Sequence, residues 1–195
     1  MSAIYQFPET SAKAAIQVFP RRALIPTGQK NLWHIQSGIV RTITYLEDGT
    51  VVTLGVWSAG DVVGDALSAI EPYIIECLSS VEVIPFSLGQ NHQLIETLTS
   101  HIEQTEELMV IRSQKSIDAM LMKLLAWLAK KFGKNIEKGK LIDLRITNQD
   151  IADMLGPTRV TISRALTQLE EQGVIKRLPL HRIVLCEEEF LGCAS

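Results

Sequence analysis

A group of hydroxyl and guanidinium side chains opens a predicted helix in the last quarter of the chain. Its members are Thr158, Arg159, Thr161, Ser163 and Arg164. Arginine forms paired hydrogen bonds with guanine edges and with phosphates. Serine and threonine hydroxyls can form hydrogen bonds with bases and with phosphates. Val160 has no polar atom to offer, but it can pack against a thymine methyl group. Side chains of these types on one helix end could therefore contact DNA.

Two apolar-periodic runs predict the helices that must position this group. Ile151 to Leu155 and Val160 to Leu169 repeat at helical spacing, and Gly156 lies in the tight turn between them. Thr147 precedes the first run with Asp150 three residues on, which resembles a capping box that usually has Glu or Gln there. A short helix, a turn and a longer helix predict a helix-turn-helix over residues 147–166.

The distribution of charge decides between DNA binding and a plain helix pair, because many all-α domains contain such pairs. Residues 158–182 hold five lysines or arginines against two glutamates, a local net of +3, whereas the whole chain carries −3. A basic hairpin is predicted over residues 175–183. Local positive charge of this kind favours a phosphate-facing surface. The predicted DNA contacts are Thr147, Gln149, Thr158, Arg159, Val160, Thr161, Ser163, Arg164, Lys176 and Arg177.

The overall composition is typical of a soluble globular protein with one large or two small domains: 195 residues, 46% hydrophobic and 21% charged. No apolar run is long enough to cross a bilayer and no signal-peptide pattern opens the chain, so a cytoplasmic location is expected. The three cysteines, Cys77, Cys186 and Cys193, form no CxxC pair. They predict neither a disulfide framework nor a four-thiolate iron–sulfur site.

The sequence gives no indication of an enzyme or of a metal site. The four histidines lie in separate predicted elements, with no nucleophile elbow, glycine-rich phosphate loop or paired-carboxylate pattern beside them. The alternative to a DNA-binding protein is a ligand-binding or interaction module that has lost DNA binding. The intact turn and the presence of Arg159, Thr161 and Arg164 disfavour that alternative.

Residues 1–90 predict an antiparallel β-roll or sandwich, although no clear pattern is visible over residues 1–13. Short stretches rich in Val, Ile, Thr and aromatic residues alternate with turns every eight to twelve residues. Glu47 to Thr50 is a strong hairpin signal. The predicted strands are 19–28, 31–36, 38–45, 51–57, 73–78 and 81–88.

From residue 91 the apolar period becomes helical and predicts a helix of about 25 residues, running with little interruption into residues 117–128. It could pack within its own subunit, connect domains or form a dimer seam. A dimer suits a helix-turn-helix because two-fold related recognition helices meet major grooves about 34 Å apart. Residues 132–135 are predicted to end the next helix, 137–140 to form a loop and 141–146 a strand. The predicted domains are 1–90, 91–114 and 115–188.

This order of elements resembles the CRP/FNR family of bacterial transcription regulators over nearly the whole chain. The motifs that carry the resemblance are Gly38 with the Asp48-Gly49 hairpin, residues 60–65 (GDVVGD) and residues 156–164 (GPTRVTISR). The resemblance implies an α+β fold: an N-terminal jelly roll like those that bind cyclic nucleotides, a dimerisation helix and a winged helix-turn-helix. It also implies a homodimer on double-stranded DNA, activator activity and contact with RNA polymerase through residues 133–141.

The same resemblance suggests which DNA bases are read. Arg159 and Arg164 would contact bases and phosphates. Family members that read TGTGA half-sites have Glu where this chain has Val160, and valine cannot accept a hydrogen bond from a cytosine amino group. We therefore predict GTA-like half-sites within a pseudo-palindrome.

An effector site is also implied by the resemblance. Cyclic-AMP binders of the family have a Gly-Glu pair followed by an arginine that holds the cyclic phosphate. Here Gly64-Asp65 matches the pair loosely, but residues 66–77 contain no arginine or lysine, which disfavours cyclic AMP. The pattern is similar to the nitrogen-regulator branch of the family, which implies 2-oxoglutarate, with His101 in place of an arginine or else simply a helix-surface histidine. Ligands of the haem and iron–sulfur branches have no counterparts here. The implied effector residues are Gly64, Asp65, Ala66, Leu67, His101 and Glu106.

Overall fold

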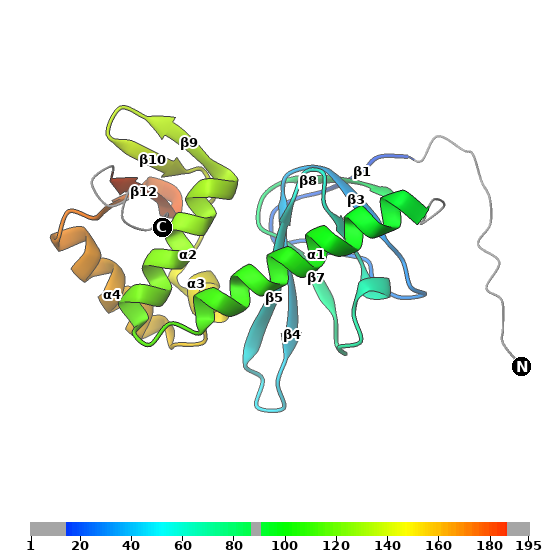
Figure 1. The fold of residues 1–195 in the computed structure, drawn as a ribbon, viewed down its shortest axis with the longest axis horizontal. Helices are drawn as coiled ribbons and strands as arrows, with labels where there is room; N and C mark the ends of the chain where they lie inside the picture. Colours follow the sequence, from blue (N-terminus) through cyan, green and yellow to red (C-terminus); the bar gives the residue numbers. More distant parts are fainter. Residues whose placement is uncertain (1–14, 87–90, 187–195) are drawn as a thin grey trace, which may run out of the picture.

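The computed structural model describes residues 15–86 and 91–186, with side chains of helix α1 from residue 95 onward. It has two lobes joined by a long helix (Figure 1). The N-terminal lobe, here called the roll, consists of two four-stranded antiparallel sheets, ordered β1-β8-β3-β6 and β2-β7-β4-β5. Its strands are β1 Gln17–Phe19, β2 Leu24–Ile25, β3 Trp33–Ser37, β4 Ile39–Tyr45, β5 Val51–Ser58, β6 Val62–Val63, β7 Ile74–Cys77 and β8 Val81–Pro85.

The core of the roll lies between its two sheets. Trp33, Ile35 and Val83 of one sheet pack with Trp57 and Ile75 of the other, each no more than 7% exposed. Burial of such side chains is the main favourable term in folding. The alternating apolar residues of the short strands therefore face this core. The predicted α+β fold class, with an N-terminal β-roll and a C-terminal helix-turn-helix, is confirmed.

Two strand predictions in the roll differ from the structure. The single strand expected over residues 19–28 is two strands separated by a turn, because Pro20 lacks a backbone donor and Arg22 adopts a left-handed φ of 71°. The strand expected over 81–88 ends at Pro85, and residues 87–90 lie outside the described residues. The hairpin predicted at residues 47–50 does join β4 to β5.

Helix α1 (Asn91–Arg112) is separate from α2 (Ile117–Phe132), although the apolar pattern predicted little interruption. Residues 113–116 connect the two helices. At the end of this link, the Ser116 side chain accepts a hydrogen bond from Ala119 N and caps α2. The inner face of α1 packs against β5, and its Leu108 and Ile111 are buried. Among the described helices none is long and apolar enough to span a membrane.

The C-terminal lobe contains the predicted helix pair and a four-stranded antiparallel sheet ordered β11-β12-β10-β9. Strand β9 was not predicted, and β10 ends at residue 142 rather than 146. Three of the four β9 residues are exposed, so no alternating apolar pattern marks this strand. The elements are β9 Gly133–Ile136, β10 Gly139–Ile142, α3 Asn148–Leu155, α4 Arg159–Glu171, β11 Ile175–Leu178, a 3-10 turn Pro179–His181 and β12 Arg182–Cys186.

The two lobes share one apolar cluster. It centres on Leu121, Leu124 and Leu128 of α2, and it also includes Val56 and Leu78 of the roll. The helix-turn-helix is therefore packed on the roll in this structure. A second, polar contact between the lobes lies beside α3.

Candidate DNA-binding interface

The start of α3 is fixed by the capping box that the sequence suggested. Thr147 accepts a hydrogen bond from Asp150 N, and the Asp150 carboxylate accepts from Thr147 N at 2.8 Å. Asp serves here because its shorter side chain still reaches the cap residue. The Thr147 hydroxyl donates to the same carboxylate at 2.8 Å. This predicted DNA contact is thus engaged within the protein.

A left-handed glycine makes the turn between the two helices. Gly156 has φ 99°, and its N–H donates to Ala152 O at 2.8 Å. Thr158 then caps α4 by accepting from Thr161 N at 3.2 Å, and the hydroxyls of these two threonines lie 2.9 Å apart. On the opposite face of α4, Ile162 and Leu166 are buried, which fixes the direction of the polar face.

Three side chains near the start of α4 project into solvent. Arg159 and Arg164 are exposed, and in the described part of the chain neither has a hydrogen-bond or ion-pair partner. Val160 is 59% exposed. A large apolar side chain gains nothing from that position in the protein alone. Ser163 and Thr161 are half-buried beside them.

The basic hairpin predicted at residues 175–183 forms the wing, which consists of β11, the 3-10 turn and β12. Lys176 is exposed. Arg177 is held by Glu170: the Arg177 side-chain Nε donates to Glu170 Oε2 at 2.6 Å, and the Arg177 backbone N–H donates to Glu170 Oε1 at 2.8 Å. These two hydrogen bonds from Arg177 lower the pKa of Glu170. The local net charge of +3 therefore includes one internally neutralised pair.

A groove of about 560 Å³ runs between α3, the start of α4 and the wing. It brings together four of the predicted contacts, Thr147, Gln149, Arg159 and Arg177. His181 and Arg182 also line it and were not among the predicted contacts. The basic composition of residues 175–183 was the only sequence feature that pointed to His181 and Arg182 as DNA contacts. No local pattern shows that the wing folds back toward α3. Three guanidinium groups around one groove suit phosphate oxygens.

Of the implied effector residues, His101 lines a cavity beside the roll. A cavity of about 320 Å³ lies between the roll and α1, and of the six only His101 lines it, beside Trp57, His34 and Asp61. His101 stacks on Trp57 with ring centroids 4.0 Å apart, so it is half-buried. Burial lowers the pKa of His101, against the opposing effect of Asp61.

The other implied effector residues have different surroundings. Asp65 accepts hydrogen bonds from Gly28 N at 3.1 Å and Lys30 N at 3.2 Å, beside the buried Gly64. Ala66 is exposed, Leu67 is half-buried and Glu106 is exposed on α1. Among the described residues no group of three or more His, Cys, Asp or Glu could hold a metal ion. Cys77 is buried and Cys186 half-buried, both as free thiols, whereas Cys193 lies outside the described residues.

Comparison with known proteins decides the family. Residues 120–193 match the model of a Crp-like helix-turn-helix domain. The chain is 40% identical to the regulatory protein CysR of Synechococcus elongatus over 80% of this chain and 77% of CysR. The chain belongs to the CRP/FNR family of transcription regulators. The resemblance drawn from the motifs is therefore confirmed.

Other members of the CRP/FNR family agree with this assignment. The global nitrogen regulator of a Nostoc strain is 31% identical over 60% of this chain and 56% of its own length. A CRP-family regulator from Thermus thermophilus superposes with a TM-score of 0.75 over 92% of this chain and 97% of that chain, at 21% identity. The latter comparison establishes the shared fold.

Proposed function

We propose that this CRP/FNR-family regulator binds a pseudo-palindromic DNA site with GTA-like half-sites as a homodimer, with α4 in the major groove. The exposed pair Arg159 and Val160 at the start of α4 carries this proposal. Arginine can bond to a guanine edge, and the adjacent valine can contact a thymine methyl group, which together select neighbouring G and T. The basic groove beside the wing supplies contacts to the phosphates.

A row of exposed apolar side chains on α1 supports the homodimer. Ile95, Leu98, Ile102 and Met109 are 64%, 41%, 57% and 65% exposed. They recur at spacings of three, four and seven residues, the pattern of a coiled-coil seam. An exposed apolar stripe on a helix is a typical protein–protein contact. A second copy of α1 would cover this seam, as is typical of the family.

Site selection from random DNA tests the proposed half-site. We expect wild-type protein to enrich paired GTA-containing half-sites, and Val160→Glu to shift enrichment toward half-sites with a cytosine amino group to contact. Gln168→Ala is a matched control at an exposed position of the same helix outside the predicted contacts, and we expect it to leave the Val160-dependent position unchanged. Wild-type enrichment of TGTGA repeats would contradict the assignment of Val160. Retention of random DNA alone would contradict sequence-specific binding altogether.

We also propose that the regulator activates transcription by contacting RNA polymerase through residues 133–141. The β9–β10 hairpin supports this assignment, because residues 134–138 are all exposed and Ile136 is 40% exposed at its end. The hairpin belongs to the same sheet as the wing, which would place it beside DNA-bound polymerase. An apolar side chain at an exposed turn is a natural protein contact.

Finally, we propose that a small molecule gates DNA binding from the cavity at His101, and that 2-oxoglutarate is the first compound to test. The charged groups at this cavity are Asp61 and Glu96, beside His34 and His101. A dicarboxylate would need a protonated histidine there, and burial keeps the pKa of His101 low.

Calorimetry with and without the DNA site tests this gating. We expect 2-oxoglutarate to bind weakly at pH 7.5 and more tightly as the pH falls, because an anion favours the protonated form of His101. Cyclic AMP should give no heat, because the segment that would grip its phosphate lacks a cation. No heat from 2-oxoglutarate at any pH would contradict this choice of ligand.

A further inference from the structure

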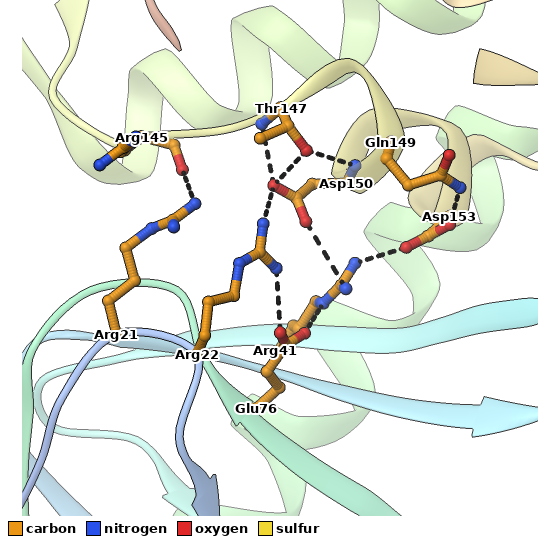
Figure 2. A network of polar contacts seen from close by, with 9 residues as sticks. All are labelled: Arg21, Arg22, Arg41, Glu76, Arg145, Thr147, Gln149, Asp150 and Asp153. Atoms are coloured by element: carbon orange, nitrogen blue, oxygen red, sulfur yellow. Dashed lines mark hydrogen bonds and ion pairs between the residues drawn. The ribbon is translucent and has the colours of Figure 1, made fainter. Parts of the chain in front are cut away.

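A cluster of charged side chains joins the roll to the first helix of the helix-turn-helix (Figure 2). This roll–α3 junction consists of Arg22, Arg41, Glu76, Asp150 and Asp153. Arg41 of β4 lies at its centre and is only 5% exposed. Its Nε donates to Glu76 Oε2 at 2.6 Å and its Nη1 to Asp153 Oδ2 at 2.9 Å, while Nη2 lies 3.5 Å from Asp150 Oδ1.

Arg22 forms a second bridge between the same elements. Its Nη1 donates to Glu76 Oε1 at 2.9 Å and its Nη2 to Asp150 Oδ2 at 2.8 Å. Burial raises the pKa of Asp150, but hydrogen bonds from Thr147 and Arg22 outweigh it and lower the pKa. The carboxylate is therefore ionised at neutral pH. Separating α3 from β4 would break the ion pairs that Asp150 and Asp153 make with Arg22 and Arg41.

The junction extends to the surface that we propose for DNA. Asp153 is shared: its Oδ2 accepts from Arg41, and its Oδ1 accepts from Gln149 Nε2 at 2.7 Å. Gln149 lines the basic groove beside Arg159. It also lines a second groove of about 610 Å³, where the tip of the β4–β5 hairpin meets the helix-turn-helix. Arg41 thus reaches the DNA-facing side through two side chains.

Helix α1 is attached to the roll by polar and aromatic contacts. Gln104 of α1 donates to Asp61 of the roll at 2.9 Å, and His101 stacks on Trp57. The link from α1 to α2 at residues 113–116 is not helical, so the chain connection alone does not set an angle. The angle depends on contacts on two sides.

On one side of the helix-turn-helix, α2 contacts α1, where Trp127 Nε1 donates to Glu107 Oε2 at 2.6 Å. On the other side, α3 is held by the roll–α3 junction and by Arg112 of α1, whose Nε donates to Met154 O at 2.6 Å. Together with the apolar cluster around α2, these contacts on different helices resist a rotation that a single contact would permit. In a dimer built on α1, that rotation would change the separation of the two recognition helices.

We propose that Arg41 is a positioning residue that, through Asp150 and Asp153, sets the spacing of half-sites that the dimer accepts. This inference rests on the proposed function, because spacing has meaning only for a dimer that reads two half-sites. One base pair rotates the duplex by about 35° and advances it by about 3.4 Å. A helix-turn-helix held at one angle therefore fits one spacing, and a loosened one accommodates several.

The test measures affinity for DNA sites whose two GTA-containing half-sites are separated by the selected spacer or by one or two base pairs more or fewer. Wild-type protein should prefer one spacer by about tenfold or more over its neighbours. Arg41→Gln should bind the best spacer about tenfold more weakly, with a flatter dependence on spacing. Its affinity for an isolated half-site should stay at the wild-type value, which a general loss of folding would not allow.

Two further variants keep the test decisive. Asp153→Asn leaves Arg41 paired with Glu76 and Asp150, and it should flatten the spacing preference even where Arg41→Gln does not fold. Lys30→Gln removes one positive charge from an exposed turn of the roll and should change nothing. Folded, dimeric Asp153→Asn and Arg41→Gln proteins that keep the wild-type spacing preference would overturn the inference. Wild-type protein that binds no half-site would instead defeat the proposed function on which it rests.

Discussion

Replacing Arg159 by alanine is expected to weaken binding to the cognate DNA site by about 1–3 kcal/mol for each half-site, while binding to random DNA changes little. The guanidinium is exposed at the start of α4 and, in the described part of the chain, has no protein partner. Its removal therefore costs the protein no internal contact. What is lost is discrimination at one guanine. Mobility shifts at fixed salt on cognate and random duplexes measure both affinities.

Arg164→Ala is a matched control for this experiment, since it removes the same exposed group about 1.4 turns further along α4. If Arg164 contacts phosphate, its loss should weaken cognate and random DNA alike and reduce the salt dependence by about one unit of slope. Equal loss on both DNAs for Arg159→Ala would mean that Arg159 also contacts only phosphate. Thermal unfolding of both variants should match wild type.

Replacing Ile102 by aspartate is expected to convert the protein to a monomer and to lower affinity for the full site by about 100-fold or more. The side chain lies in the middle of the apolar row on α1 and is 57% exposed. Aspartate there would place two like charges against each other in a dry seam. Each protomer should still fold, because Ile102 is not part of its core. Sedimentation and mobility shifts measure the two effects.

Glu103→Gln is the control for the dimer prediction, because it changes the charge of α1 by one unit at an exposed position outside the row. It should leave both the dimer and the DNA affinity unchanged. Affinity of Ile102→Asp for an isolated half-site should also stay at the wild-type value. A monomeric Ile102→Asp protein with full-site affinity equal to wild type would show that the two half-sites are not read together.

The parts of the fold that could be predicted from sequence are those with local causes. Alternation of apolar residues marked the strands of the roll, and helical spacing marked the helix pair. Gly156 and the caps at Thr147 and Thr158 act within a few residues of their own position. Strand β9, which was not predicted, forms with mostly exposed residues and is held by its partner strand rather than by its own pattern.

Within the candidate DNA site, the sequence identified suitable residue types but did not show which of them also bond to other groups of the protein. Thr147 and Thr158 have hydroxyls suited to DNA, yet both cap helices. Arg177 counted toward the positive charge, yet it is paired with Glu170. The Arg177–Glu170 contact, unlike the two caps, depends on how the wing lies against α4. The DNA contacts themselves stay predictions.

The sequence by itself determined the family, the β-roll, the helix pair and the basic start of α4, because each follows from neighbouring residues or from motifs. Only the tertiary structure decided how the lobes meet. Arg41 and Asp153 are 112 residues apart in the chain, and Arg22 and Asp150 are 128 apart. No local pattern links such positions. Folding brings them together at the contact between the lobes, where Arg41, Asp150 and Asp153 are buried and each has an oppositely charged partner.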